Sequence, residues 1–158
     1  MAKIIKTNVM RLLDGAKIPY KEHCYAESGV VSGVDVARVL GQSPDRVFKT
    51  LVTEGASRAH YVFVVPVEKE LDLKKAAKAV GEKSIAMIPA KTLLPLTGYI
   101  HGGCSPIGMK KLFATTVDAS ARDRETICVS AGKIGYQVEL APADLEKMIP
   151  LTYADIIA

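Results

Sequence analysis

Two almost continuous apolar stretches, at residues 47–53 and 61–67, are the strongest pattern along the chain. Both are rich in β-branched and aromatic residues, which favours strands, and their apolar residues stand at successive rather than alternate positions. This pattern is typical of strands that are covered on both faces, so we expect the two stretches to lie in a central sheet. Shorter stretches of similar composition predict further strands at residues 18–25, 112–117, 126–130 and 136–140.

Helices are predicted between these strands, from cap residues that precede apolar positions at helical spacing and from glycines that follow them. Two are expected at residues 4–14, where Ile5, Val9, Leu12 and Leu13 share one face before Gly15, and from Ser32 or Asp35 to Gly41, with Val36, Val39 and Leu40 as apolar positions. Three more are expected at 72–80 after an Asp72 cap, at 89–94 from Pro89, and from Pro142 onward. Because the strands neither alternate strictly with helices nor form one block, we predict an α+β (mixed α/β) fold with a mixed, partly barrel-like central sheet flanked by helices.

Length and composition narrow the class of protein. The 158 residues contain no linker, repeat or low-complexity segment, so we expect a single domain over residues 1–158. No uncharged apolar run approaches about 18 residues, which predicts a soluble, cytoplasmic protein without a membrane segment. Three distant cysteines predict reduced thiols rather than a disulfide framework or a zinc site. The 21 basic and 17 acidic residues permit an anionic partner without requiring one.

The segment 97–111, TGYIHGGCSPIGMKK, combines a glycine pair with a helix-start pattern. Gly102 and Gly103 can adopt backbone angles closed to other residues, which lets their N–H groups turn toward one point. Ser105 can cap a helix whose first residue is Pro106, and the positive end of its dipole would add to the same spot. The segment therefore predicts a binding site for an oxyanion, and an ordinary tight turn is the alternative.

Lys49 stands among apolar residues in the stretch 47–52. Its ammonium must be paired, reach water from an edge strand, or point into a cavity, because an isolated buried charge is costly. A lysine in a cavity suits a phosphate, a carboxylate or a developing oxyanion. Lys110 and Lys111 would lie in the first turns of the helix after Ser105, where they either grip nucleic-acid phosphates or form a solvated basic face.

Other groups offer weaker candidates for chemistry. His101 and Cys104 have ligand-like spacing, but zinc needs at least three protein ligands, and a Cys104 nucleophile activated by His101 is the alternative. Cys24 and Cys128 lie in strand-like segments and are expected to be small core residues. Residues 130–133 form a second small-residue turn, which either faces the glycine pair or simply closes a hairpin. The glycines match neither a dinucleotide-binding nor a P-loop pattern.

Four motifs in order resemble one known family over nearly the whole chain. They are VFKTL at 47–51, LDLKK at 71–75, the TGYIHGGCSPIGMKK segment and VSAGK at 129–133. This arrangement resembles the YbaK/EbsC family of trans-acting aminoacyl-tRNA deacylases, which is similar to the editing domain inserted in bacterial prolyl-tRNA synthetase. The resemblance implies a helix-flanked mixed sheet whose cleft receives the 3′ end of a mischarged tRNA.

The resemblance also implies a reaction and its partners. Family members of the cysteine branch remove cysteine from tRNA(Pro) and from tRNA(Cys), whereas other branches remove alanine. We expect the cysteine activity, with aminoacyl-tRNA as partner, prolyl-tRNA synthetase as a further partner, and no cofactor, metal or membrane. Alanine removal, and tRNA binding without catalysis, remain the alternatives. In the family mechanism the substrate's own thiol attacks its ester, which forms a thiolactone and frees the tRNA.

Site residues follow from matching the motifs position by position. Lys49 matches the family's essential lysine and Gly102 the glycine whose amide approaches the substrate, and we expect the amide of Gly103 beside it. The expected substrate-binding residues are Tyr25, Thr50 and Ser130, which match pocket positions, together with His101 and Ser105 of the glycine segment. Relatives often place an acidic residue after the Ser130 turn, but this chain has Gln137 there.

Overall fold

The two apolar stretches form an antiparallel hairpin in the computed structural model, which describes residues 6–30 and 32–158. Strand β2 (Phe48–Gly55) pairs with β3 (His60–Pro66), and Lys49 lies opposite Val65. The predicted strands at 47–53 and 61–67 are thus confirmed with small shifts of their ends.

Strand β3 is covered on both faces, as its unbroken apolar pattern predicts. Phe63 and Val65 are fully buried against α3 (Leu73–Val80) and β4 (Ile85–Met87). On the opposite face, Val62 and Val64 belong to the main apolar cluster. The hairpin is therefore central to the fold.

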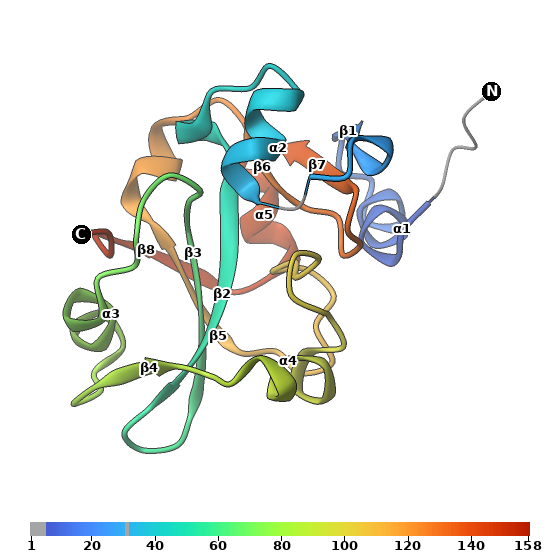
Figure 1. Ribbon diagram of the computed structural model, residues 1–158. Helices are drawn as coiled ribbons and strands as arrows, with labels where there is room; N and C mark the ends of the chain where they lie inside the picture. The colour runs from blue at the N-terminus through green and yellow to red at the C-terminus, as the bar shows by residue number, and fades with distance from the viewer. Residues whose placement is uncertain (1–5, 31) are drawn as a thin grey trace.

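A five-stranded sheet forms around this hairpin in the order β4–β2–β3–β5–β8. Its further strands are β5 (Ala114–Asp118) and β8 (Leu151–Ala154), and both lateral pairs on this side, β3–β5 and β5–β8, are parallel. The mixed sheet is confirmed, although β4 and β8 were not expected. Figure 1 shows α3 and α4 (Ala90–Thr97) at opposite sides of these strands.

A second sheet contains β1 (Lys21–Cys24), β7 (Tyr136–Leu140) and β6 (Ile127–Ser130), in that order and all antiparallel. A parallel bridge between Val47 and Cys128 joins it to the start of β2. The main cluster holds residues of both sheets, among them Val64 and Val138, so one apolar core joins the two sheets. The structure has two bridged sheets, so the barrel-like closure is not confirmed.

The predicted helices are present with corrected ends. Asp72 caps α3 as predicted, since its Oδ1 accepts hydrogen bonds from the backbone N–H groups of Lys74 and Lys75 at 3.0 Å each. Helix α4 continues past Leu94 to Thr97 despite an internal proline. The other three are α1 (Asn8–Gly15), α2 (Gly33–Val39) and α5 (Pro142–Met148), and short 3₁₀ turns occur at η1 (Ala26–Ser28), η2 (Pro44–Arg46) and η3 (Ala119–Asp123).

Two predicted helix faces are partly wrong. Helix α1 begins at Asn8 after a Thr7 cap, and Ile5, expected on its apolar face, lies outside the described residues. Leu12 is 39% exposed and Val39 is 48% exposed, because each short helix buries only a narrow stripe. No helix in the described part of the chain is long and apolar enough to cross a membrane.

The start of α2 is packed tightly against the end of the hairpin, and this contact predicts the effect of Gly33→Ala. A Cβ at Gly33 would lie 2.4 Å from Val67 Cγ1, and a stiff valine side chain cannot move away freely. We expect Gly33→Ala to lower the free energy of unfolding by about 1–3 kcal/mol, as overpacking does. Urea denaturation measures this change.

The control is Gly15→Ala at the end of α1, where a new Cβ meets nothing within 4 Å. We expect no loss of stability there. Adding Val67→Ala to Gly33→Ala should recover part of the lost stability in a double-mutant cycle. Strictly additive losses would show that the clash is not the cause.

Candidate functional site

A cavity of about 720 Å³ opens where α2, α4 and the two sheets meet along β2. Its walls are mainly apolar, with side chains from β2, α2 and α4. Its polar groups come from separate parts of the chain: Tyr25, Ser32, Lys49, Thr50, His101, Ser130 and Gln137. An apolar cavity of this size with a few convergent polar groups is typical of a ligand site.

The floor of this cavity is a free edge of β2. On its outer side, β2 pairs with β4 only from Thr53 to Gly55, and the bridge to β6 is at Val47. The five residues between these points, 48–52, all line the cavity. The carbonyl of Val52 accepts a hydrogen bond from Ile88 N–H at 3.4 Å on that side, so the open part of the edge is centred on Thr50. The edge is therefore open to a ligand.

The hydrogen-bond register shows which backbone groups face this opening. Val67 N–H donates to the carbonyl of Val47 at 2.8 Å, and Gly55 N–H donates to the carbonyl of Ala59 at 2.8 Å. Because bonded pairs alternate along an antiparallel ladder, the odd-numbered residues of β2 bond to β3. The N–H and C=O groups of Thr50 therefore point toward the cavity.

Lys49 and Thr50 both line the cavity, as the sequence predicts. Lys49 is half-buried, and in the described part of the chain its ammonium makes no hydrogen bond or ion pair. Thr50 Oγ1 is buried and also has no partner among the described residues. Two consecutive residues of the open edge thus carry polar groups without partners in the described part of the chain. Because their side chains point to opposite faces of the sheet, a ligand at the edge can meet one from each face.

The glycine pair does not act as a pair. Gly102 has φ of +88° and lines the cavity, as expected for a glycine that lets the chain turn beside a ligand. Gly103 N–H instead donates to the carbonyl of Ile100 at 3.0 Å, inside the turn, and Gly103 does not line the cavity. The predicted convergence of two backbone donors is therefore wrong for Gly103.

The helix predicted after Ser105 is also absent, and the substrate contact expected for Ser105 is not supported. Ser105 is fully buried and its Oγ accepts a hydrogen bond from Ile107 N–H at 3.2 Å, so it caps only a local turn. Tyr99 donates its hydroxyl proton to the carbonyl of Ile107 at 2.5 Å, and Gly108 has φ of +80°. Both features stop a helix, so no helix begins at Pro106. Lys110 and Lys111 therefore do not lie in the first turns of a helix.

The second small-residue turn faces the glycine segment and also closes the β6–β7 hairpin. A Cβ at Gly103 would lie 3.1 Å from the backbone nitrogen of Ile134, so the two loops are in contact. Ser130 lines the cavity beside this contact, and its Oγ accepts a hydrogen bond from Gly132 N–H at 3.1 Å. Tyr25, which is 7% exposed, lines the same wall from the end of β1.

The cysteines differ from the prediction in one case. Cys104 lines the cavity, but burial raises the pKa of its thiol to about 12, which leaves it protonated and a poor nucleophile beside His101. Cys24 is exposed rather than part of the core, because β1 is an edge strand. Cys128 is buried, as expected.

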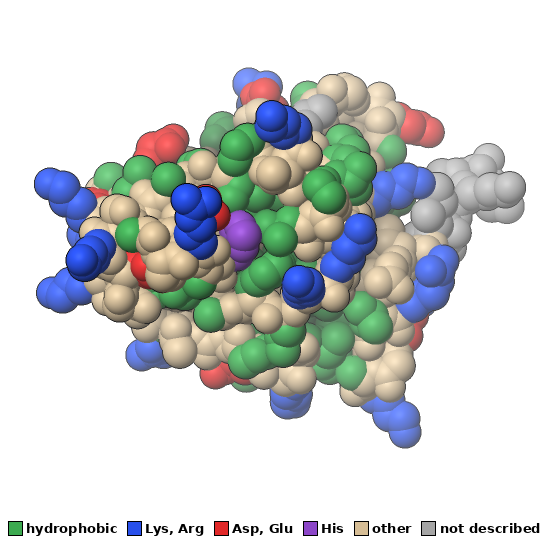
Figure 2. Space-filling view, turned by 90° about the horizontal axis from the view of Figure 1, so that it is seen from below, with side chains coloured by type: hydrophobic (Ala, Val, Ile, Leu, Met, Phe, Trp, Pro, Cys, Tyr) green, Lys and Arg blue, Asp and Glu red, His purple; other side chains and the backbone are tan. Residues whose placement is uncertain are grey.

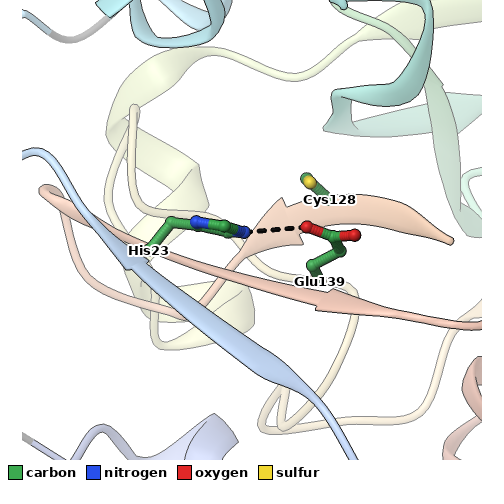
Figure 3. Close-up of side chains that lie close together, drawn as sticks. All are labelled: His23, Cys128 and Glu139. Atoms are coloured by element: carbon green, nitrogen blue, oxygen red, sulfur yellow. Dashed lines mark hydrogen bonds and ion pairs between the residues drawn. The ribbon is translucent and has the colours of Figure 1, made fainter. Parts of the chain in front are cut away.

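Figure 3 shows a cluster that the sequence did not reveal. It includes Cys128, which lies on the same face of β6 as Ser130 because successive side chains of a strand alternate. His23, Cys128 and Glu139 come from three strands, and their donor atoms lie within 4.8 Å of one another. Glu139 Oε1 is 2.8 Å from His23 Nε2, while Oε2 accepts hydrogen bonds from Thr126 at 2.6 Å and from Arg46 at 3.5 Å. Burial raises the pKa of the Cys128 thiol to about 12. Both carboxylate oxygens are occupied and one partner is cationic, so the cluster is explained as a polar network without an ion.

The network continues into the cavity through Gln42. Its Nε2 donates to Gln137 Oε1 at 2.7 Å and lies 3.7 Å from Cys128 Sγ. Gln137 is 4% exposed and lines the cavity. Alternation along β7 places residues 137 and 139 on one face, which a sequence can suggest, but the approach of Gln42 from a distant loop has no local sequence pattern.

Residues 27–148 match the model of the aminoacyl-tRNA editing domain. The chain belongs to this family. The matched range contains all residues that line the cavity except Tyr25.

Two curated relatives and two solved structures agree with this membership. The chain is 48% identical over 152 residues, 96% of its length and 93% of the relative's, to "Putative Cys-tRNA(Pro)/Cys-tRNA(Cys) deacylase EbsC" of Enterococcus faecalis (strain ATCC 700802 / V583). It is 27% identical over 99 residues, 63% of its length and 17% of the relative's, to a proline–tRNA ligase of Pelobacter propionicus (strain DSM 2379 / NBRC 103807 / OttBd1).

The fold is shared with the hypothetical protein APE2540, at a TM-score of 0.86 and 21% identity over 95% of this chain and 99% of that one. It is also shared with a structure described as "a putative trans-editing enzyme for prolyl tRNA synthetase", at a TM-score of 0.79 and 21% identity over 96% and 98%. At these identities the two structures establish the fold alone, and they confirm the predicted mixed α+β architecture.

The polar network at Glu139 predicts a pH-dependent contribution to stability. The hydrogen bond from Thr126, then His23 and Arg46, lower the pKa of Glu139 below its ordinary value. A carboxylate with a lowered folded-state pKa stabilises the protein above its unfolded pKa, and this contribution is lost as pH falls through the folded value. We expect Glu139→Gln to lower the free energy of unfolding by about 1–3 kcal/mol at pH 7.

The deficit should shrink below about pH 4, where the wild-type carboxylate also becomes protonated. Urea denaturation at pH 7 and at low pH measures both values, and Glu22→Gln, at an exposed position of β1, is the control that should change neither. A deficit that is the same at both pH values would contradict the assigned role of the carboxylate charge.

Proposed function

We propose that this chain is a trans-acting deacylase that removes cysteine from Cys-tRNA(Pro) and from Cys-tRNA(Cys). The observation that carries the proposal is the 48% identity, over nearly the full length of both chains, to a relative named for this activity. The cavity supports it, because about 720 Å³ can hold an aminoacyl group together with part of the terminal adenosine.

In the proposed reaction the thiol of the misplaced cysteine attacks the carbonyl carbon of its own ester. The C–O bond to the ribose breaks, a thiolactone forms, and the thiol proton ends on the released ribose hydroxyl. No protein nucleophile is needed, in agreement with the protonated, buried thiol of Cys104. Holding thiol and ester in reactive geometry can lower the barrier by about 7–11 kcal/mol.

The chain's own residues would supply position and charge. Lys49 brings an unpaired ammonium to the open edge of β2, where it can stabilise the oxyanion that develops on the ester carbonyl. Gly102 offers a backbone turn beside the same cavity. Tyr25, Thr50 and Ser130 would contact the aminoacyl-adenosine, with exposed His101 at the entrance.

The partner is an aminoacyl-tRNA, and the surface suits it. Figure 2 shows apolar side chains in the centre of one face, with Lys and Arg side chains spaced around them. Lys and Arg side chains spaced in this way can contact the phosphates of a nucleic acid. We further propose that the protein works in the cytoplasm and that prolyl-tRNA synthetase reads part of the tRNA, because a net charge of +4 is modest for a tRNA-binding protein.

Replacing Lys49 tests this function. We expect Lys49→Met to lower the single-turnover rate of Cys-tRNA(Pro) deacylation by about 10²-fold or more, the effect of removing one oxyanion-stabilising group. Release of labelled cysteine from the preformed aminoacyl-tRNA measures the rate. Lys78→Met, at an exposed position of α3 outside the cavity, removes the same charge and should leave the rate nearly unchanged.

Running Ala-tRNA(Pro) beside Cys-tRNA(Pro) decides the substrate. A wild-type protein that cleaves the alanyl ester faster, or one that binds both tRNAs and cleaves neither above the uncatalysed rate, would overturn the proposal.

A further inference from the structure

The cavity presents no negative charge to a ligand. In the described part of the chain none of its lining residues is Asp or Glu, and Lys49 is the one lining residue with a permanent charge. The other titratable groups that face it are Tyr25 at the end of β1, and His101 and Cys104 in the glycine segment. Burial raises the pKa of Cys104 to about 12, so this thiol brings no charge at neutral pH.

An aminoacyl ester carries an α-amino group, which is an ammonium when protonated. Inside this cavity an ammonium would meet a like charge at Lys49 and no opposite charge, and moving it out of water under these conditions is unfavourable. The nearest carboxylate on the sheet face, Glu139, is held by His23, Thr126 and Arg46. The electrostatics therefore favour the uncharged amine.

Gln137 provides a specific group for that form. Its Oε1 already accepts the hydrogen bond from Gln42 Nε2 at 2.7 Å, and no described residue accepts a hydrogen bond from its Nε2. Because Gln137 lines the cavity, the amide group that it leaves without a described partner there is a donor rather than an acceptor. A donor can bond to the lone pair of a neutral amine but not to an ammonium, which has no lone pair. Thr50, with its unpartnered Oγ1 and its free carbonyl edge, can accept the N–H groups.

We propose that the cavity selects the aminoacyl ester whose α-amino group is uncharged, and that Gln137, positioned by Gln42, sets this preference. The inference rests on the proposed deacylase function and adds to it the protonation state of the bound substrate. It makes Gln137 a specificity-determining residue of the site.

The test compares wild-type protein on Cys-tRNA(Pro) and on 3-mercaptopropionyl-tRNA(Pro), an analogue that keeps the thiol and the ester but lacks the amine. The two thiols have different pKa values, because the amine of the first ester acidifies its thiol, so each thiol is titrated separately and kcat/KM is compared per thiolate. After this correction both esters report the titration of the enzyme, whereas only the first reports the amine. With an α-amino pKa of about 7.7, the neutral fraction falls by roughly 30-fold between pH 8 and pH 6.

We expect kcat/KM for the analogue to lie within about 10-fold of the native value at pH 8, and the analogue-to-native ratio to rise by roughly 10- to 30-fold at pH 6. A constant ratio, or an analogue that is about 100-fold slower at both pH values, would overturn the inference. Cleavage of neither ester would instead refute the proposed function, so the two failures are distinguishable.

Gln137→Glu provides the matching change in the protein. Its carboxylate can still accept the hydrogen bond from Gln42 and adds the missing negative charge. We expect the fall in native kcat/KM from pH 8 to pH 6 to become at least about 3-fold smaller, with the analogue's profile unchanged. An unaltered native profile in a folded variant would count against Gln137.

Asn8→Asp is the matched control, because it makes the same amide-to-carboxylate change at an exposed position of α1 outside the cavity. It should keep the wild-type pH profile. The comparison of the two esters needs only the wild-type protein, so it remains decisive if Gln137→Glu fails to fold.

Discussion

The stretch of β2 that has no neighbouring strand is the constraint on which the site depends. A strand edge must find partners for its N–H and C=O groups, and most of this sheet supplies them with other strands. Between the Ile88 N–H bond to Val52 and the bridge to β6, no described strand pairs with the outer edge of β2, and α2 and α4 line the cavity there instead. The result is an apolar chamber with a polar backbone floor, in which Lys49 and Thr50 have no protein partner among the described residues.

The cavity has no free carboxylate because the acidic group near it is bound by other side chains. Glu139 lies on the same sheet face as the cavity wall, yet its two oxygens are bound by neighbouring side chains of the network. The residues that line the cavity therefore bring no negative charge, so the positive charge of the Lys49 ammonium is not cancelled and acts on any ligand that enters. A stabilising network in one part of a sheet thus determines the electrostatics of the neighbouring part.

The sequence predicts what is decided locally and fails where distant groups compete. The hairpin and the Asp72 cap were predictable, because apolar patterning and a side-chain oxygen before a helix act over a few residues. The helix expected at Ser105 was wrong, because the hydroxyl of Tyr99 takes a carbonyl it would need and Gly108 turns left-handed. The apolar surroundings of Lys49 left both an edge strand and a cavity open, and the family motif placed it in the site. The Glu139 network joins separate strands, so no local sequence pattern predicts it.

The contact between Gly103 and the backbone of Ile134 has a mechanical consequence. With no side chain between them, the two loops touch main chain to main chain, and neither can shift inward without pushing the other. A side chain at position 103 would push the two loops apart and carry Gly102 away from Ser130, so the spacing of this wall of the cavity depends on the absence of a Cβ there.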